Sequence, residues 1–261
     1  MNMIKKIAAS MAIAVASFSS SASPINVGGV IWDPDYVDDL SGTAGLIHQD
    51  ADASRNISGY GVVTFLNGQN ESYYCPGCEL EFEFGGYSIS TIDGGPSPFT
   101  DPSGGVDDAF FEYTGGWVKF YVDNTPEYIT SVTALNSTNT GSGGGANLLW
   151  LELEGAVFEG TETTFHGGPV GSIAAGAGDW DVVGGAAMGN FDTNSILLDG
   201  GAYADMSFGS IFSILKPNGD GTSSSTGTAS FVGESIPEPT SLAIFGLALL
   251  AFGASTRKKL L

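Results

Sequence analysis

Apolar and polar residues alternate along several segments of the chain. In residues 79–84 one leucine and two phenylalanines alternate with three glutamates, and in residues 149–154 three leucines alternate with Trp150 and two glutamates. Because successive side chains of a strand point to opposite faces, this spacing predicts strands with one apolar face. Further strands are predicted at residues 62–66, 128–135, 202–215 and 228–232.

Glycine separates these runs, with 39 glycines in 261 residues. Asn67-Gly68 predicts a tight turn after the strand at 62–66. Gly115-Gly116 lies between two apolar runs of opposite parity and predicts either a hairpin or a bulge. Between residues 23 and 236 no long stretch has a helical period free of glycine. We therefore expect an all-β domain at residues 23–236, an antiparallel β-sandwich of jelly-roll type.

The N-terminus has the pattern of a secretory signal peptide. Lys5 and Lys6 precede an apolar run at residues 7–18, and small residues follow it up to Ala22. This order predicts a signal peptide at residues 1–22, cleaved between Ala22 and Ser23.

The C-terminus, residues 237–261, has three parts in a fixed order. Pro237, Glu238 and Pro239 come first, an apolar stretch at 242–254 follows, and a basic end closes the chain. The two prolines keep the backbone extended, as a protease requires of its substrate. As a single hydrophobic helix of the precursor, the apolar stretch with its flanks covers about 20–25 Å, which is short for a bilayer. The basic end would stay cytoplasmic.

These C-terminal residues resemble the PEP-CTERM sorting signal of Gram-negative bacteria. The resemblance implies that an exosortase, a membrane protease, processes the chain at the motif while the precursor is transiently held in the inner membrane. It also implies a mature protein that is secreted or displayed at the cell surface, in a system that accompanies exopolysaccharide production. The alternative is that the tail stays as an uncleaved anchor. A second, looser resemblance to cargo proteins of this class covers residues 178–212.

The charge of the predicted domain is strongly negative. Residues 23–236 contain 28 of the 29 acidic residues and three of the eight basic ones, a net charge of 28 minus 3, or −25. Nucleic acids and anionic membranes would repel such a chain. We therefore expect no nucleic-acid partner.

Cys75-Pro76-Gly77-Cys78 is the most specific internal motif. Proline and glycine at the two central positions favour a type II turn, which brings the flanking Cα atoms within reach of a disulfide. Export places the pair in an oxidising compartment, so we predict a Cys75–Cys78 disulfide. A redox site and a zinc site are the alternatives, although only His48 and His166 could add histidine ligands to zinc.

Two groups of aspartates are candidate calcium ligands, because calcium prefers carboxylate and carbonyl oxygens on flexible loops. The candidates are Asp33, Asp35, Asp38, Asp101, Asp107 and Asp108. The alternative is that these residues are solvent-exposed acidic side chains in loops, without a bound ion. Beyond calcium we predict no cofactor.

Trp150 falls on the polar side of its alternating run, so we expect an exposed side chain that contributes to a ligand-binding face. No motif of a known enzyme class is present, so the leading interpretation is a non-catalytic protein. It would be associated with extracellular polysaccharide or a biofilm matrix, as the sorting signal implies. A calcium-dependent carbohydrate-binding module is the alternative. A secreted glycoside hydrolase comes third, since it would need only two suitably placed carboxylates.

Overall fold

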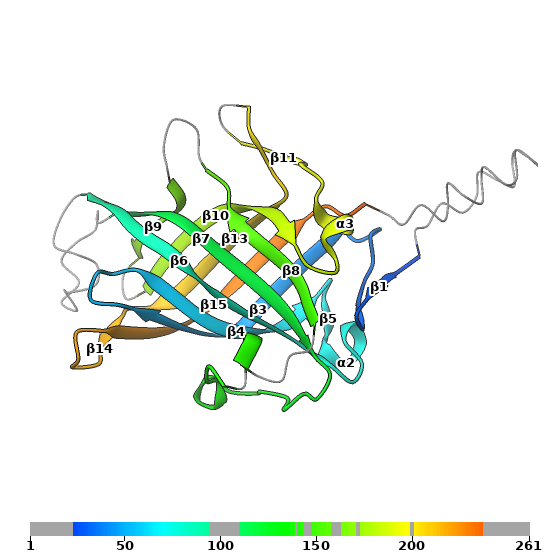
Figure 1. Cartoon of the computed structure of the whole chain (residues 1–261), viewed down its shortest axis with the longest axis horizontal. Helices are drawn as coiled ribbons and strands as arrows, with labels where there is room; N and C mark the ends of the chain where they lie inside the picture. The colour runs from blue at the N-terminus through cyan, green and yellow to red at the C-terminus, as the bar shows by residue number, and fades with distance from the viewer. Residues whose placement is uncertain are drawn as a thin grey trace, which may run out of the picture. The chain divides into compact units, whose positions relative to one another are not determined.

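The computed structural model describes residues 23–93, 110–138, 140–143, 148–157, 163–170, 173–198 and 201–236. Within them an eight-stranded antiparallel barrel closes on itself (Figure 1). Its strands are β3 (Leu40–Ala51), β4 (Ile57–Leu66), β6 (Glu79–Asp93), β7 (Phe110–Asp123), β8 (Leu148–Gly155), β10 (Ile173–Gly184), β13 (Met206–Ser213) and β15 (Ser223–Gly233). Each strand pairs with the next one along the chain, and β15 closes the barrel by pairing with β3.

The prediction of an all-β antiparallel fold is confirmed, and the prediction of a jelly-roll sandwich is wrong. Alternation shows that one face of each strand is buried, but two stacked sheets and one closed sheet both bury one face. The decisive contact is the pairing of Ser223–Thr226 in β15 with His48–Ala51 in β3. These segments are far apart in the chain, so local spacing carries no signal for their pairing.

One position in the barrel is shared by two strands. β8 pairs with residues 117–122 of β7, whereas β9 (Thr163–Val170) pairs with residues 111–114. On the other side, β10 pairs with β9 through residues 173–178 and with β8 through residues 180–184. β8 and β9 therefore lie end to end between β7 and β10.

The Gly115-Gly116 pair is not a hairpin, because β7 runs through it without interruption. Gly115 and Gly116 have φ angles of 68° and 95°, and Gly86 on the paired strand β6 has a φ of 74°. These conformations are accessible mainly to glycine. They switch the side-chain parity of both strands, so that Phe84 and Tyr87 both face the interior although they are three residues apart. Glycine kinks of this kind let a sheet curve into a barrel.

Short elements cover one end of the barrel (Figure 1, right). They are the hairpin of β1 (Ile25–Val27) and β2 (Val30–Trp32), and the single-turn helices α2 (Glu71–Tyr74) and α3 (Met188–Phe191). The remaining short strands are β5 (Gln69–Asn70), β11 (Ile196–Leu197), β12 (Tyr203–Ala204) and β14 (Lys216–Pro217). The Asn67-Gly68 turn between β4 and β5 is confirmed, with both residues at positive φ.

The strand predicted at residues 128–135 is not present. Residues 124–138 and 140–143, here called the strap, form an irregular segment with two 3₁₀ turns, η1 (Val132–Ala134) and η2 (Gly141–Gly143). Ile129 and Leu135 pack with Val62 in a cluster separate from the interior core. The apolar residues that suggested a strand thus attach the strap to the outside of the barrel (Figure 1, green segment near β4).

Candidate functional site

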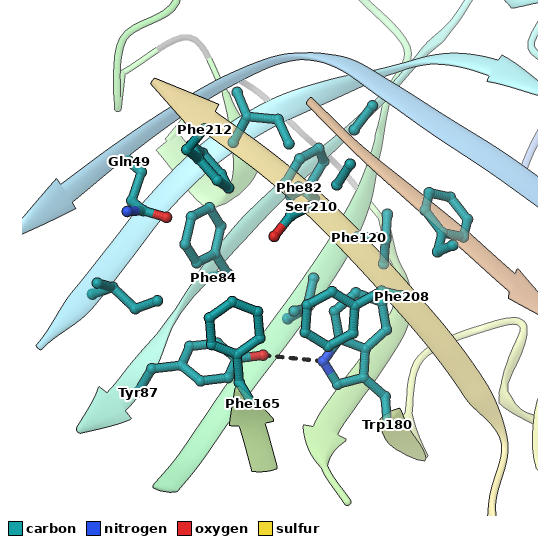
Figure 2. A pocket seen from close by; sticks show the side chains of 16 residues that line it. Gln49, Phe82, Phe84, Tyr87, Phe120, Phe165, Trp180, Phe208, Ser210 and Phe212 are labelled. Carbon is teal, nitrogen blue, oxygen red and sulfur yellow. Dashed lines mark hydrogen bonds between the residues drawn. The ribbon is translucent and has the colours of Figure 1, made fainter. Parts of the chain in front are cut away.

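The barrel interior contains a cavity of about 60 Å³, counted as the space open to the centre of a water molecule. Figure 2 shows how aromatic rings from several strands surround it. Nine aromatic, five aliphatic and two polar residues form the lining: Phe82, Phe84, Tyr87, Phe120, Phe165, Trp180, Phe208, Phe212, Phe231, Ala44, Ile47, Ile57, Val118, Ala229, Gln49 and Ser210. None of these sixteen residues carries a carboxylate, an imidazole or an amine.

The rings around the cavity stack on one another. Trp180 and Phe208 lie with their centroids 3.9 Å apart and nearly parallel, and Phe165 stacks on the same Phe208 at 5.6 Å. The Trp180 indole N–H donates a hydrogen bond to the Tyr87 hydroxyl at 3.0 Å (Figure 2). Burial raises the pKa of Tyr87 well above its ordinary value, so the phenol keeps its proton. This cluster forms an apolar wall with one pair of polar groups, the Trp180 indole N–H and the Tyr87 hydroxyl.

A second, smaller cavity of about 40 Å³ adjoins the first. The two share five lining residues: Gln49, Ile57, Phe165, Ser210 and Phe212. Gln49 and Ser210 are both buried. They bring the amide and hydroxyl groups of the interior to the boundary between the two cavities.

The Cys75–Cys78 disulfide is present, with the Cα atoms 5.1 Å apart. The backbone N–H of Cys78 donates to the carbonyl of Cys75 at 3.0 Å, and Gly77 has a φ of 88°, as a type II turn requires. Both sulfurs are buried in the interior core, and the pair joins α2 to β6. This position after a helix, followed by a strand, fits a structural crosslink. Redox sites of this type begin a helix instead.

The aspartates proposed as calcium ligands are only partly described. Asp33 accepts a hydrogen bond from the backbone N–H of Asp35, and Asp38 lies in the same turn-rich segment between β2 and β3. Asp101, Asp107 and Asp108 lie outside the described residues. In the part of the chain that is described, no group of three or more His, Cys, Asp or Glu side chains is arranged to hold a metal ion.

The expectation that Trp150 is exposed is wrong, because its side chain is 1% exposed. The ladder between β7 and β8 shifts register at this point: Phe120 pairs with Leu151 but Tyr121 pairs with Leu149. Trp150 is the extra residue of a bulge, which changes its side relative to simple alternation. It packs edge-on against Trp32 with centroids 5.9 Å apart, and its N–H donates to the carbonyl of Val27. Because Trp150 is buried, it cannot contribute to an exposed ligand-binding face.

The strap covers carboxylates that the sequence analysis did not single out. Glu79 and Glu81 on β6 are 0% and 1% exposed, and Asp123 at the end of β7 is also buried. The backbone N–H of Ile129 in the strap donates to Glu79 Oε1 at 3.1 Å. Among the described residues, Glu79 Oε2 and Glu81 Oε2 have no hydrogen-bond partner. The glutamates that alternate with Leu80 and Phe82 thus form a covered acidic face.

The pKa values of these glutamates respond to that environment. Burial, with Glu71 and Asp123 nearby, raises the pKa of Glu79 to about 7. Burial, with Glu79, Asp123 and Glu127 nearby, raises the pKa of Glu81 to about 8. Backbone donors of the strap oppose both shifts but do not cancel them. The sequence shows the alternating glutamates, but it does not show that the strap buries them.

A buried aspartate organises residues 178–212. Asp205, between β12 and β13, accepts hydrogen bonds from the backbone N–H groups of Val182, Thr193 and Asn194 at 2.5–2.7 Å. These bonds tie the loop after α3 to β10. Asp205 therefore has a structural role in this segment.

The folded part of the chain begins shortly after the first predicted processing point and ends shortly before the second. β1 begins at Ile25, two residues after Ser23, and Ala22 lies outside the described residues. At the other end, the N–H of Ser235 donates to Asp39 Oδ2 at 2.9 Å and the N–H of Ile236 donates to the carbonyl of Asn190 at 2.7 Å. The chain is therefore fastened to the barrel up to the residue before Pro237; Pro237, Glu238 and Pro239 lie outside the described residues.

Comparison with known families identifies this end of the chain. The model of the PEP-CTERM protein-sorting motif matches residues 235–258. The motif marks the chain as a substrate of an exosortase, and PEP-CTERM proteins are exported and sorted to the cell surface. No curated protein and no solved structure matches the chain. Within the described ranges, no helix combines the length and hydrophobicity needed to span a membrane, and residues 242–254 lie outside those ranges.

Proposed function

We propose that the processed chain is a non-catalytic barrel protein of the extracellular polysaccharide or biofilm matrix of a Gram-negative bacterium. The precursor passes through the inner membrane, where an exosortase removes the tail. The observation that carries this proposal is the sorting motif at residues 235–258. It begins just after the last barrel strand, at Ser235 and Ile236, whose backbone N–H groups are hydrogen-bonded to Asp39 and Asn190. Processing within the motif would leave the fold intact.

The cavity supports a non-catalytic role. Hydrolysis of a glycosidic bond by the usual mechanism needs two carboxyl groups on opposite sides of the bond. The lining of the interior cavity offers aromatic rings, aliphatic groups, an amide and hydroxyls instead. A closed wall of this composition favours binding or a purely structural role over acid–base chemistry.

Cell fractionation tests the matrix association. The protein is followed in supernatant, envelope and purified extracellular polysaccharide, in the producing host and in a matched strain that makes no exopolysaccharide. We expect the barrel to sediment with the polysaccharide and to shift to the free supernatant fraction in the deficient strain. An identical distribution in both strains would contradict the proposal.

The same fractions separate the two alternatives. Release of the barrel from polysaccharide by a calcium chelator would favour a calcium-dependent carbohydrate-binding module. New reducing ends in polysaccharide incubated with the barrel would favour a glycoside hydrolase. We expect neither.

A further inference from the structure

Three alternate glutamates of β6 accept hydrogen bonds from the strap. The bonds run from the Ile129 N–H to Glu79, from the Gly141 N–H to Glu81 and from the Ser142 hydroxyl to Glu83. Gly141 permits this approach, because its φ is 60° and a Cβ atom there would lie 3.1 Å from Glu83. The strap therefore lies directly on the acidic outer face of β6.

Two of these carboxyl groups each keep an oxygen without a partner. Counting every residue that the structure describes, Glu79 Oε2 and Glu81 Oε2 form no hydrogen bond, and the two residues are 0% and 1% exposed. An ionised carboxylate in such a place is strongly unfavourable unless a cation pairs with it, whereas the neutral acid is tolerated far better. The closed strap is therefore compatible with the protonated form of both glutamates.

The groups around the two buried glutamates do not compensate a negative charge. Those from β4, β6, β7, α2 and the strap are Tyr60, Glu83, Tyr121, Asp123, Glu71, Tyr74, Glu127 and Tyr128. None of these groups carries a positive charge. On β7, Lys119 pairs instead with Glu152 at 2.9 Å. On β3, the His48 ring lies 3.1 Å from Asp50. Ionisation would therefore add two charges to surroundings that are already negative.

We propose that protonation controls the strap: it stays closed over β6 while Glu79 and Glu81 are protonated, and it opens when they ionise. Opening separates Ile129 and Leu135 from Val62 and so exposes an apolar patch on the outside of β4 beside the row of glutamates. The closed state holds protons that the open state gives up, so rising pH favours opening. Burial raises the pKa of Glu79 to about 7 and that of Glu81 to about 8, which places the end of the transition near pH 8. This behaviour belongs to the barrel itself and does not depend on association with a matrix.

Hydrogen exchange of backbone amides tests the proposal, using the processed protein purified from the producing host. The reporters are Ile129, Ala134 and Leu135, whose N–H groups are hydrogen-bonded in the closed strap. After correction for the intrinsic pH dependence of exchange, their protection should fall about 100-fold between about pH 5.5 and about pH 8.5, since each ionising group contributes up to about ten-fold per pH unit. Amides of β10 and β13 should still be protected at the upper end of this range, because the opening is local.

Matched variants assign the effect to the two glutamates. Glu79→Gln/Glu81→Gln keeps acceptors for the strap but cannot ionise, so its strap amides should stay protected across the whole range. Glu154→Gln removes one charge at an exposed position of β8 and should behave as the wild type. If the double variant does not fold, Glu81→Gln alone should reduce the fall in protection about ten-fold. The same pH dependence in the glutamine variants as in the wild type, or loss of protection in β10 and β13 together with the strap, would overturn the proposal.

Discussion

Glycines of β4 leave the space that the interior aromatic rings occupy. A Cβ atom at Gly59 would lie 2.5 Å from the Phe84 ring and 2.2 Å from the carbonyl oxygen of His48. Gly61 has the same relation to Phe82, at 2.6 Å. Since Gly59 pairs with Phe84 and Gly61 with Phe82 across the strands, each glycine accommodates the ring of its partner.

The substitution Gly59→Ala should therefore destabilise the barrel. We expect the free energy of unfolding to fall by about 1–3 kcal/mol, as for other overpacked cores, because a backbone oxygen and a packed ring must both shift. Denaturation in urea measures the change. Gly209→Ala is the control, since nothing lies within 4 Å of a Cβ atom at Gly209. A loss at Gly209 equal to that at Gly59 would contradict this account.

Single residues also show where sequence reasoning succeeds and fails. The Cys75–Cys78 disulfide and the Asn67-Gly68 turn were predictable because their geometry depends on two to four consecutive residues. Trp150 was misassigned because a bulge changes the parity of the strand, and the bulge depends on the neighbouring strand β7. Gln49 carried no local signal, since its neighbours His48 and Asp50 are also polar.

At the scale of elements, the strap and the carboxylates beneath it make stability depend on pH. Glu79 and Glu81 are influenced by Glu71 in α2, by Asp123 on β7 and by Glu127 in the strap, all of them acidic. Lys119 on β7 is paired with Glu152 at 2.9 Å. The raised pKa values mean that the folded state holds protons that the unfolded chain releases.

We therefore expect the free energy of unfolding to fall as pH rises from about 4.5, the ordinary value for Glu, through the folded pKa values of about 7 and about 8. Below that range the stabilisation is fully present, and above it the loss is complete. Each group contributes a slope of at most about 1.4 kcal/mol per pH unit. Urea titrations at about 0.5 M salt measure this effect while screening the general repulsion of an acidic protein.

The double variant Glu79→Gln/Glu81→Gln tests the assignment. Glutamine keeps an acceptor for the Ile129 N–H but does not ionise, so the pH dependence should flatten and the variant should exceed the wild type in stability near pH 9. Glu154→Gln, at an exposed position of β8, is the control and should keep the wild-type slope. A double variant with an unchanged slope would show that these carboxylates are not responsible.

At the scale of the whole molecule, the strand content was predictable but the closure was not. Period-two alternation along β6 and β8 identifies buried faces, yet a sandwich and a barrel share that pattern. Closure depends on the long-range pairing of β15 with β3 and on the glycine kink shared by β6 and β7. The interior cavity exists because the sheet closes into a barrel, so no local sequence motif predicts it.

The sorting tail was predictable for the opposite reason. Its three parts are consecutive in the chain, so the motif can be recognised without any contact made in the folded barrel. The fold and the motif meet at Ser235 and Ile236, where the last fastened residues precede the first proline of the motif.

Intact-mass spectrometry of the protein from culture supernatant and cell envelope of the producing host tests the central claim most directly. Export and sorting predict a species that begins near Ser23 and ends near Pro237–Pro239, with or without an added group at its new C-terminus. A species that retains residues 242–261 in both fractions would contradict processing by an exosortase and would make the tail a permanent anchor.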